Sequence, residues 1–522
     1  MNQKFTALRR ALPGFTLLIP LLAFAGVLFG LQKENGPAVM AGAAKVDITP
    51  AYPVRLSGYA GRTAPSDGIS QRLWTKALAF GKTPDDTAVI VTVDNLAVPG
   101  SLADEVFKRV SAKVPFQRRN FTVCSSHTHN APMLTGIIAF LFSKDIIPAE
   151  QEAIDRYTAE LKDKMEQVVL QALADRKPAT LAYGTGRAGF AKNRRTPNGP
   201  VDQSLPMLAV RGPGGELRAV WTNYACHCTT LSSNLIGGDW AGYAQEFIEQ
   251  DHPGCIALVS IGCAGDANPA NMGSTPATEA NGREIAAEVT RLLGTPLQPL
   301  AQSPAGTLRR FELPFGPLPD RAKWDAMSKT PGVVGYHARK NLERLDRGET
   351  LPTVLPYSVQ SWTFGDDLAM VFMAGEVVVD YSLRIKGAYD RVWVTAYSND
   401  VPCYIPSARI LKEGGYEGAA AMPYYDRPTV LGPKTEELIF GEVSKVIPAS
   451  FKAKKMAGVA PPVSAAESLQ RIKTKPGFTV DLVAAEPDIV DPAAIDFGAD
   501  GKLWVVEMRD YPLGMDGNGQ PG

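Results

Sequence analysis

The feature that most constrains the fold is an alternation of short apolar, β-rich runs with amphipathic helical stretches, from Gly42 to about Phe451. The β-rich runs are residues 88–93, 121–124, 219–225, 255–261, 368–373 and 392–396. Between two of these runs, apolar residues recur at helical spacing from Ile154 to Ala172. A second helix is predicted over 283–293, with Gly294 after its end. Short strands separated by helices predict an α/β domain, in which a mixed β-sheet core is flanked by helices.

The first residues are typical of an export segment. Three basic residues, Lys4, Arg9 and Arg10, precede an apolar run over residues 12–31. We predict that residues 1–31 are a signal peptide or a retained N-terminal anchor, because the run is long for a cleaved signal. In either case the rest of the chain would be exported to the periplasm, the extracellular space or the membrane surface, and an anchor would associate it with the membrane.

The chain is too long for one ordinary core, so we expect more than one folding unit. Residues 42–451 form the predicted main domain, and residues 452–470 form a predicted linker that contains Ala-Pro-Pro-Val-Ser. Residues 471–522 form a separate C-terminal unit.

Within the C-terminal unit we expect two strands, 478–483 and 503–506, around a turn at 498–501. Two strands cannot bury a core of their own. We therefore expect this unit to be a fragment of a larger domain or a poorly packed appendage.

Charge and cysteine content narrow the setting. Lysines plus arginines number 54 and aspartates plus glutamates number 54, so there is no electrostatic case for a nucleic-acid partner. Export would permit disulfides among the six cysteines. However, most of the cysteines end apolar runs, where buried small apolar residues are at least as good an interpretation.

Histidine is scarce, which makes its placement informative. Of five histidines, His127 and His129 follow one predicted strand, and His227 follows another. Alternate residues of an extended segment point the same way, and α/β sheets bind ligands beyond the carboxyl ends of their strands. The pattern predicts a metal site, with hydrogen-bonded core or loop histidines as the alternative. For His252 and His337, in polar surroundings, that alternative is preferred.

Carboxylates near strand ends are candidates to complete such a site. A catalytic zinc takes three or four N, O or S donors and keeps a position for water. The candidates are Asp94, Asp239, Asp266 and Glu376. Asp239 directly precedes a predicted helix, where helix capping is the alternative role. Cys226 and Cys228 flank His227, but neighbours in an extended segment point away from it, so we expect them outside the site.

Several segments, in the same order, resemble the neutral/alkaline non-lysosomal ceramidases across residues 42–450. They are residues 43–50 (Ala-Ala-Lys-Val-Asp-Ile-Thr-Pro), 56–61, 125–129 (Ser-Ser-His-Thr-His), 193–194 with 201–202, 224–230, 239–243 and 265–269. Several motifs in register are much more specific than any one of them.

The resemblance implies a ceramidase-like catalytic domain and a site with assigned roles. The implied ligands of Zn²⁺ are His127, His227, Glu376 and Tyr404. The implied catalytic residues are His129, Asp266 and Asn268. The implied substrate-binding residues are Asn193, Arg194 and Asp239.

The implied reaction is hydrolysis of an amide, such as an N-acyl lipid or ceramide-like substrate, or of an ester. Zinc lowers the pKa of bound water toward about 7, which supplies hydroxide at neutral pH. His129 would relay a proton or orient the intermediate.

Asn268 departs from the family pattern, which has Gly-Asp-x-Ser-Pro where this chain has Gly-Asp-Ala-Asn-Pro over 265–269. An amide cannot replace a nucleophile or a hydroxyl proton shuttle, but it can donate to a carbonyl. We also expect the family's extra C-terminal β-sandwich to be missing. The predicted function is therefore an exported zinc-dependent hydrolase whose small-molecule or lipid-like substrate is left open.

Two alternatives remain from the sequence. One is a non-catalytic metal- or ligand-binding module of a larger surface protein. The other is part of a redox enzyme, because residues 475–484, 492–497 and 501–507 resemble the first blade of a sugar-dehydrogenase-like β-propeller, which would be truncated here.

Overall fold

The computed structural model describes residues 39–453, 464–475, 477–485, 488–489 and 492–507. The predicted signal or anchor at 1–31 and the middle of the predicted linker lie outside these residues. No helix in the described part of the chain is both long and apolar enough to cross a membrane.

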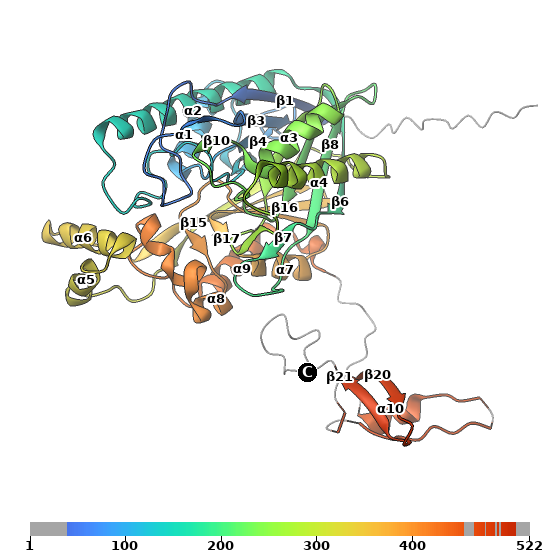
Figure 1. Cartoon of the computed structure of the whole chain (residues 1–522). Coiled ribbons are helices and arrows are strands. Elements are labelled where there is room, and N and C mark those ends of the chain that lie inside the picture. The colour runs from blue at the N-terminus through green and yellow to red at the C-terminus, as the bar shows by residue number, and fades with distance from the viewer. Residues whose placement is uncertain (1–38, 454–463, 476, 486–487, 490–491, 508–522) are drawn as a thin grey trace, which may run out of the picture. The chain divides into compact units, whose positions relative to one another are not determined.

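The larger sheet has nine strands and is mixed (Figure 1). Its strands run in the order β11-β9-β8-β6-β1-β3-β4-β5, and β13 also pairs with β6. The strands are β1 (Val39–Asp47), β3 (Trp74–Phe80), β4 (Ala88–Val93), β5 (Phe121–Ser125), β6 (Lys177–Arg187), β8 (Ser204–Arg211), β9 (Leu217–Tyr224), β11 (Ile256–Ile261) and β13 (Gln298–Leu300). Only β4–β5 and β9–β11 pair in parallel within this sheet of described residues. The predicted mixed sheet is confirmed.

A second sheet of four strands packs against the first, which the sequence did not predict. It consists of β14 (Ala305–Pro314), β15 (Val354–Phe364), β16 (Leu368–Met373) and β18 (Val392–Thr395). The indole rings of Trp221 in β9 and Trp393 in β18 lie 4.5 Å apart. Phe80 of β3 meets Trp362 of β15 edge to face. Large aromatic side chains therefore fill the space between the sheets.

Helices cover the outer faces of both sheets (Figure 1). On the larger sheet these are α1 (Gly100–Ser111), α2 (Pro148–Ala174), α3 (Asp239–Asp251) and α4 (Thr275–Leu293). On the smaller sheet they are α7 (Val379–Ala388) and α9 (Thr435–Val446). The apolar residues that predicted a helix over 154–172 are all buried in α2. The helix predicted over 283–293 is the C-terminal part of α4, and Gly294 caps it.

All six cysteines are buried and free. Their interpretation as small apolar core residues is confirmed. Cys226 and Cys228 lie in the core beside aliphatic side chains.

The C-terminal unit contains α10 (Ala465–Arg471) and a hairpin of β20 (Pro492–Phe497) and β21 (Leu503–Glu507). The turn predicted at 498–501 is confirmed, since the Gly498 N–H donates to the Lys502 carbonyl. The first predicted strand is wrong: residues 478–483 are not a strand, and 492–497 pairs with β21 instead. A tight turn pairs the two segments that directly flank it, so 492–497 is the partner of β21. Pro492 is tolerated in this strand because it is the first residue of the strand.

Phe80→Ala tests the packing between the sheets. Phe80 is fully buried against Trp362 and Phe364, so its truncation is expected to lower the free energy of unfolding by about 3–5 kcal/mol. Urea denaturation followed by tryptophan fluorescence measures this. Leu438→Ala, at a side chain 40% exposed on α9, is the control and should change it by less than about 0.5 kcal/mol.

Candidate metal centre

The ends of strands from both sheets meet at one buried site. His127 follows β5 and His227 follows β9, both in the larger sheet. Glu376 opens β17 (Glu376–Val377) just after β16, and Tyr404 opens β19 (Tyr404–Ile405). These two short strands pair in parallel and place Glu376 directly opposite Tyr404. The four implied zinc ligands are thereby brought together.

The distances are those of a compact cluster. Glu376 Oε2 lies 3.2 Å from His127 Nε2 and 3.1 Å from His227 Nε2. Tyr404 Oη lies 3.3 Å from His227 Nε2, and His129 Nε2 lies 3.2 Å from His127 Nε2. His127, His227, Glu376 and Tyr404 are each at most 3% exposed. His129 is the partly exposed member, so it marks the open side of the cluster.

A backbone carbonyl fixes the tautomer of each imidazole. In all three histidines Nδ1 lies at hydrogen-bond distance from a carbonyl oxygen. The pairs are His127 with Leu96 (2.7 Å), His227 with Ala264 (2.6 Å) and His129 with Gly58 (3.1 Å). A carbonyl only accepts, so each Nδ1 carries the proton and each Nε2 presents a lone pair. Metal-binding histidines are held in the same way, through the ring nitrogen that does not contact the metal.

Most of the atoms that face one another in the cluster are therefore acceptors. Burial lowers the pKa of His129 well below its ordinary value and that of His227 to about 4, so both are neutral at pH 7. Burial alone would raise the pKa of Glu376, but the adjacent imidazoles of His127 and His227 lower it well below its usual range. The Tyr404 hydroxyl can donate to His227 Nε2, whereas His127 Nε2 faces His129 Nε2 and Glu376 Oε2. Such a convergence of nitrogen and carboxylate ligand atoms suits a cation. The three histidines form a group whose ligand atoms all lie within 4.8 Å of one another.

Two tyrosines at the site were not predicted. Tyr425 Oη donates to Glu376 Oε1, the oxygen that does not face the histidines. The Tyr397 ring lies 4.3 Å from the His127 ring, and its buried hydroxyl has no partner in the described structure. No spacing signal distinguishes these two among sixteen tyrosines. Their assignment requires the folded loops.

Backbone strain is concentrated around the cluster. His127, Tyr397 and Asn399 all have positive φ, at 54°, 50° and 62°. Non-glycine residues rarely adopt this conformation, and it persists where surrounding contacts enforce it, commonly at functional sites.

Arg194 connects the cluster to Asn268. Its guanidinium donates to Tyr404 Oη at 3.0 Å, to Asn268 Oδ1 at 3.3 Å and to Glu417 Oε1 at 2.8 Å. Because a guanidinium only donates, the Asn268 oxygen must face Arg194, which leaves the amide NH₂ of Asn268 free to donate elsewhere. Arg194 and Asn268 thus lie beside the cluster, as the resemblance implied.

Other candidates lie behind the cluster or away from it. Asp266 accepts from the Val379 N–H and from Asn193 Nδ2, so both of its carboxylate oxygens are occupied one layer behind His227. Asp239 accepts from the Leu231 and Trp240 N–H groups rather than meeting the histidines.

Asp94 is also held away from the histidines. Its carboxylate accepts from the Trp74 N–H and from Gln245 Nε2. Burial raises the pKa of this group.

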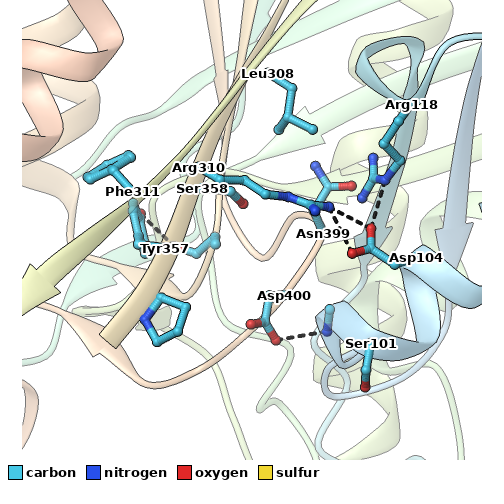
Figure 2. Close-up of a pocket in the computed structure, with 13 residues that line it drawn as sticks. Ser101, Asp104, Arg118, Leu308, Arg310, Phe311, Tyr357, Ser358, Asn399 and Asp400 are labelled. Carbon is cyan, nitrogen blue, oxygen red and sulfur yellow. Dashed lines mark hydrogen bonds and ion pairs between the residues drawn. The ribbon is translucent and has the colours of Figure 1, made fainter. Parts of the chain in front are cut away.

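A separate cavity of about 270 Å³ contains none of the predicted site residues (Figure 2). Within it Asp104 bridges Arg118 and Arg310, and Asp400 accepts from the Gly100 N–H at 3.0 Å. The Asp400 carbonyl accepts from the N–H of Gly375, the residue before Glu376. The cavity lies between α1 and strands β14 and β15. Through Asp400, its lining also holds the segment that precedes Glu376.

The three histidines of the cluster lie in a part of the chain that matches a known domain family. Residues 39–283 match the neutral/alkaline non-lysosomal ceramidase N-terminal domain. Glu376 and Tyr404 lie beyond this match. Residues 464–522 match a domain of unknown function, DUF7133. The resemblance of the C-terminal unit to a β-propeller stays a prediction.

Curated relatives of the ceramidase-like domain are ceramidases of plants. The neutral ceramidase of Oryza sativa subsp. japonica is 25% identical over 235 residues, which are 40% of this chain and 28% of the relative. Neutral ceramidase 2 of Arabidopsis thaliana is 24% identical over 257 residues, which are 44% of this chain and 32% of the relative. The match spans less than a third of the length of each.

Solved structures extend the likeness to the second sheet. The neutral ceramidase from Pseudomonas aeruginosa superimposes with a TM-score of 0.61 at 19% identity, over 77% of this chain and 72% of that one. A ceramidase complexed with C2 gives 0.61 at 19% identity, over 77% and 73%. The predicted ceramidase-like mixed α/β fold is confirmed.

Proposed function

We propose that this protein is a zinc-dependent hydrolase that cleaves an amide, or an ester, at the cluster around His127. One observation carries the proposal: the Nε2 atoms of three histidines and Glu376 Oε2 converge on one buried point, as the ligand atoms of a metal would. The names of the relatives support an amide, and make an N-acyl lipid the first substrate class to test.

The side chains present fit Zn²⁺. His127, His227, Glu376 and Tyr404 supply two nitrogens and two oxygens, which is a zinc-type donor set. Bound zinc would act as a Lewis acid and would lower the pKa of a water molecule at the site.

The surrounding residues have separate tasks in this proposal. His129 holds its proton at Nδ1 against the Gly58 carbonyl, so its Nε2, which lies 3.2 Å from His127 Nε2, is the atom that would accept a proton. Arg194 fixes Asn268 with its NH₂ free, and this amide is placed to donate to the carbonyl oxygen of a substrate. Asn268 offers no nucleophile, so we propose hydrolysis by direct attack of water, without a covalent acyl intermediate.

Metal removal and return test the function. We expect that chelation of the purified full chain abolishes hydrolysis of N-acyl substrates, and that about one zinc per chain restores it. His129→Ala should retain zinc but lose at least about 100-fold in kcat/KM, as expected for an acid–base group. His252→Ala is the matched control, because this half-buried histidine contacts Thr290, and its loss should leave both properties unchanged.

Equal turnover by the metal-free protein would refute the proposal. Tight zinc binding without hydrolysis across amide and ester panels would instead favour a metal-binding module of a larger protein. The predicted export of the chain is proposed on the N-terminal sequence pattern alone.

A further inference from the structure

A second cavity, of about 500 Å³, borders the metal cluster. Residues 194–196, Glu413 and 415–417 line it. Arg194 belongs to both places, because its guanidinium donates to Tyr404 Oη at 3.0 Å. The Tyr416 ring also lies 5.4 Å from the Tyr404 ring. A substrate whose scissile bond lies at the cluster would thus extend one of its parts into this cavity.

The charges of this cavity are balanced and paired with one another. Glu417 contacts both Arg194 and Arg195, and Arg195 also donates to Glu413 at 3.1 Å. A ligand that carries only a negative or only a positive charge therefore finds no unpaired side chain of opposite charge in this cavity. An apolar chain placed here would remove water from these groups without replacing the hydrogen bonds that the water makes, which disfavours its binding.

One aromatic face is exposed at the same cavity. The side chain of Tyr416 is 45% exposed, unlike most large rings of the main domain. It opens a π-helix (Tyr416–Ala420) that follows Gly414 and Gly415, whose φ angles are 72° and 75°. Short π-helices are frequent at functional sites. The local backbone thus presents a fixed aromatic surface beside a row of paired polar groups.

We infer that this cavity binds a hydroxyl-rich group, a sugar or related polyol, as the amine or alcohol part of the substrate. The C–H face of a sugar ring packs on an aromatic face such as that of Tyr416. Its hydroxyls both donate and accept, which matches the alternating guanidinium and carboxylate groups of Arg195, Glu413 and Glu417. The assignment of this group as part of a substrate rests on the proposed function, whereas its binding does not.

A matched pair of small amides tests the inference by calorimetry on the full chain. N-acetylglucosamine presents a hydroxyl-rich ring, and N-acetylcyclohexylamine presents an apolar ring of the same size on the same amide. We expect at least tenfold tighter binding of the first, reduced at least fivefold in Tyr416→Ala. Leu438→Ala, another exposed apolar side chain, is the control and should bind as the wild type does.

Equal or tighter binding of the cyclohexyl compound, or no effect of Tyr416→Ala, would overturn the inference. Turnover is measured in parallel with these two amides and N-acetylsphingosine. A higher kcat/KM for the lipid would overturn the polyol assignment while leaving the zinc hydrolase intact. Polyol binding through Tyr416, together with no turnover across the amide and ester panels, would refute the hydrolase and keep the binding site.

Discussion

Glu376→Gln is expected to abolish zinc binding and with it the gain in melting temperature that zinc gives the wild type. The carboxylate is the anionic donor of the proposed site, so its loss should weaken zinc binding by well over about 100-fold. With zinc at about 100 times its Kd, the wild type gains about 2.7 kcal/mol of stability that the variant cannot gain.

The hydrogen bonds at this position should keep the metal-free variant folded. A glutamine can still accept from Tyr425 through Oε1. Its NH₂ would then face the Nε2 atoms of His127 and His227, where the native carboxylate oxygen Oε2 lies. Both ends of the side chain therefore keep partners, and we expect a metal-free melting temperature within a few degrees of the wild type.

Differential scanning calorimetry with and without zinc measures both effects. Glu437→Gln, at an exposed carboxylate of α9, is the control and should leave both melting curves in place. A metal-free Glu376→Gln protein that melts several degrees below the wild type, and still gains stability from zinc, would contradict the proposed site.

Gly58→Ala is expected to reduce kcat/KM by about 100-fold while zinc stays bound. A Cβ at this position would lie 2.7 Å from atoms of the His129 ring, and Gly58 has a φ of 93° that alanine rarely adopts. The same glycine supplies the carbonyl that holds His129 Nδ1. A shift of about 1 Å in a catalytic group commonly costs about 100-fold.

Gly61→Ala is the matched control in the same loop, because a Cβ there meets nothing within 4 Å. Steady-state kinetics and elemental analysis of both variants separate catalysis from metal binding. Gly58→Ala activity within twofold of the wild type would show that His129 needs no such positioning.

The sequence predicted the fold class because the strands and helices have distinct periodicities. It did not predict the second sheet, and β16 shows why. All six residues of Leu368–Met373 are buried, with Leu368, Met370 and Phe372 facing the larger sheet and the alternate residues facing the helices. A strand that is apolar on both faces carries no pattern that says what covers each face.

The histidines of the site were predictable because they are few and follow strands. Glu376 could not be ranked above Asp94, Asp239 or Asp266 from the residues alone. Its selection depends on the pairing of two very short strands, β17 and β19, which no periodicity reveals. Only the resemblance singled out Glu376 among these carboxylates and indicated Tyr404, and nothing in the sequence indicated Tyr425.

The meeting of two sheets at the cluster has a consequence for the growing chain. His227 and Glu376 are 149 residues apart. At ribosomal rates of about 5–20 residues per second, His227 is synthesised roughly 7–30 s before the carboxylate, and His127 earlier still. During that interval only a pair of imidazoles exists, with no anion to discriminate among cations. In the proposed site, selection of the ion would therefore wait until the second half of the polypeptide has been made.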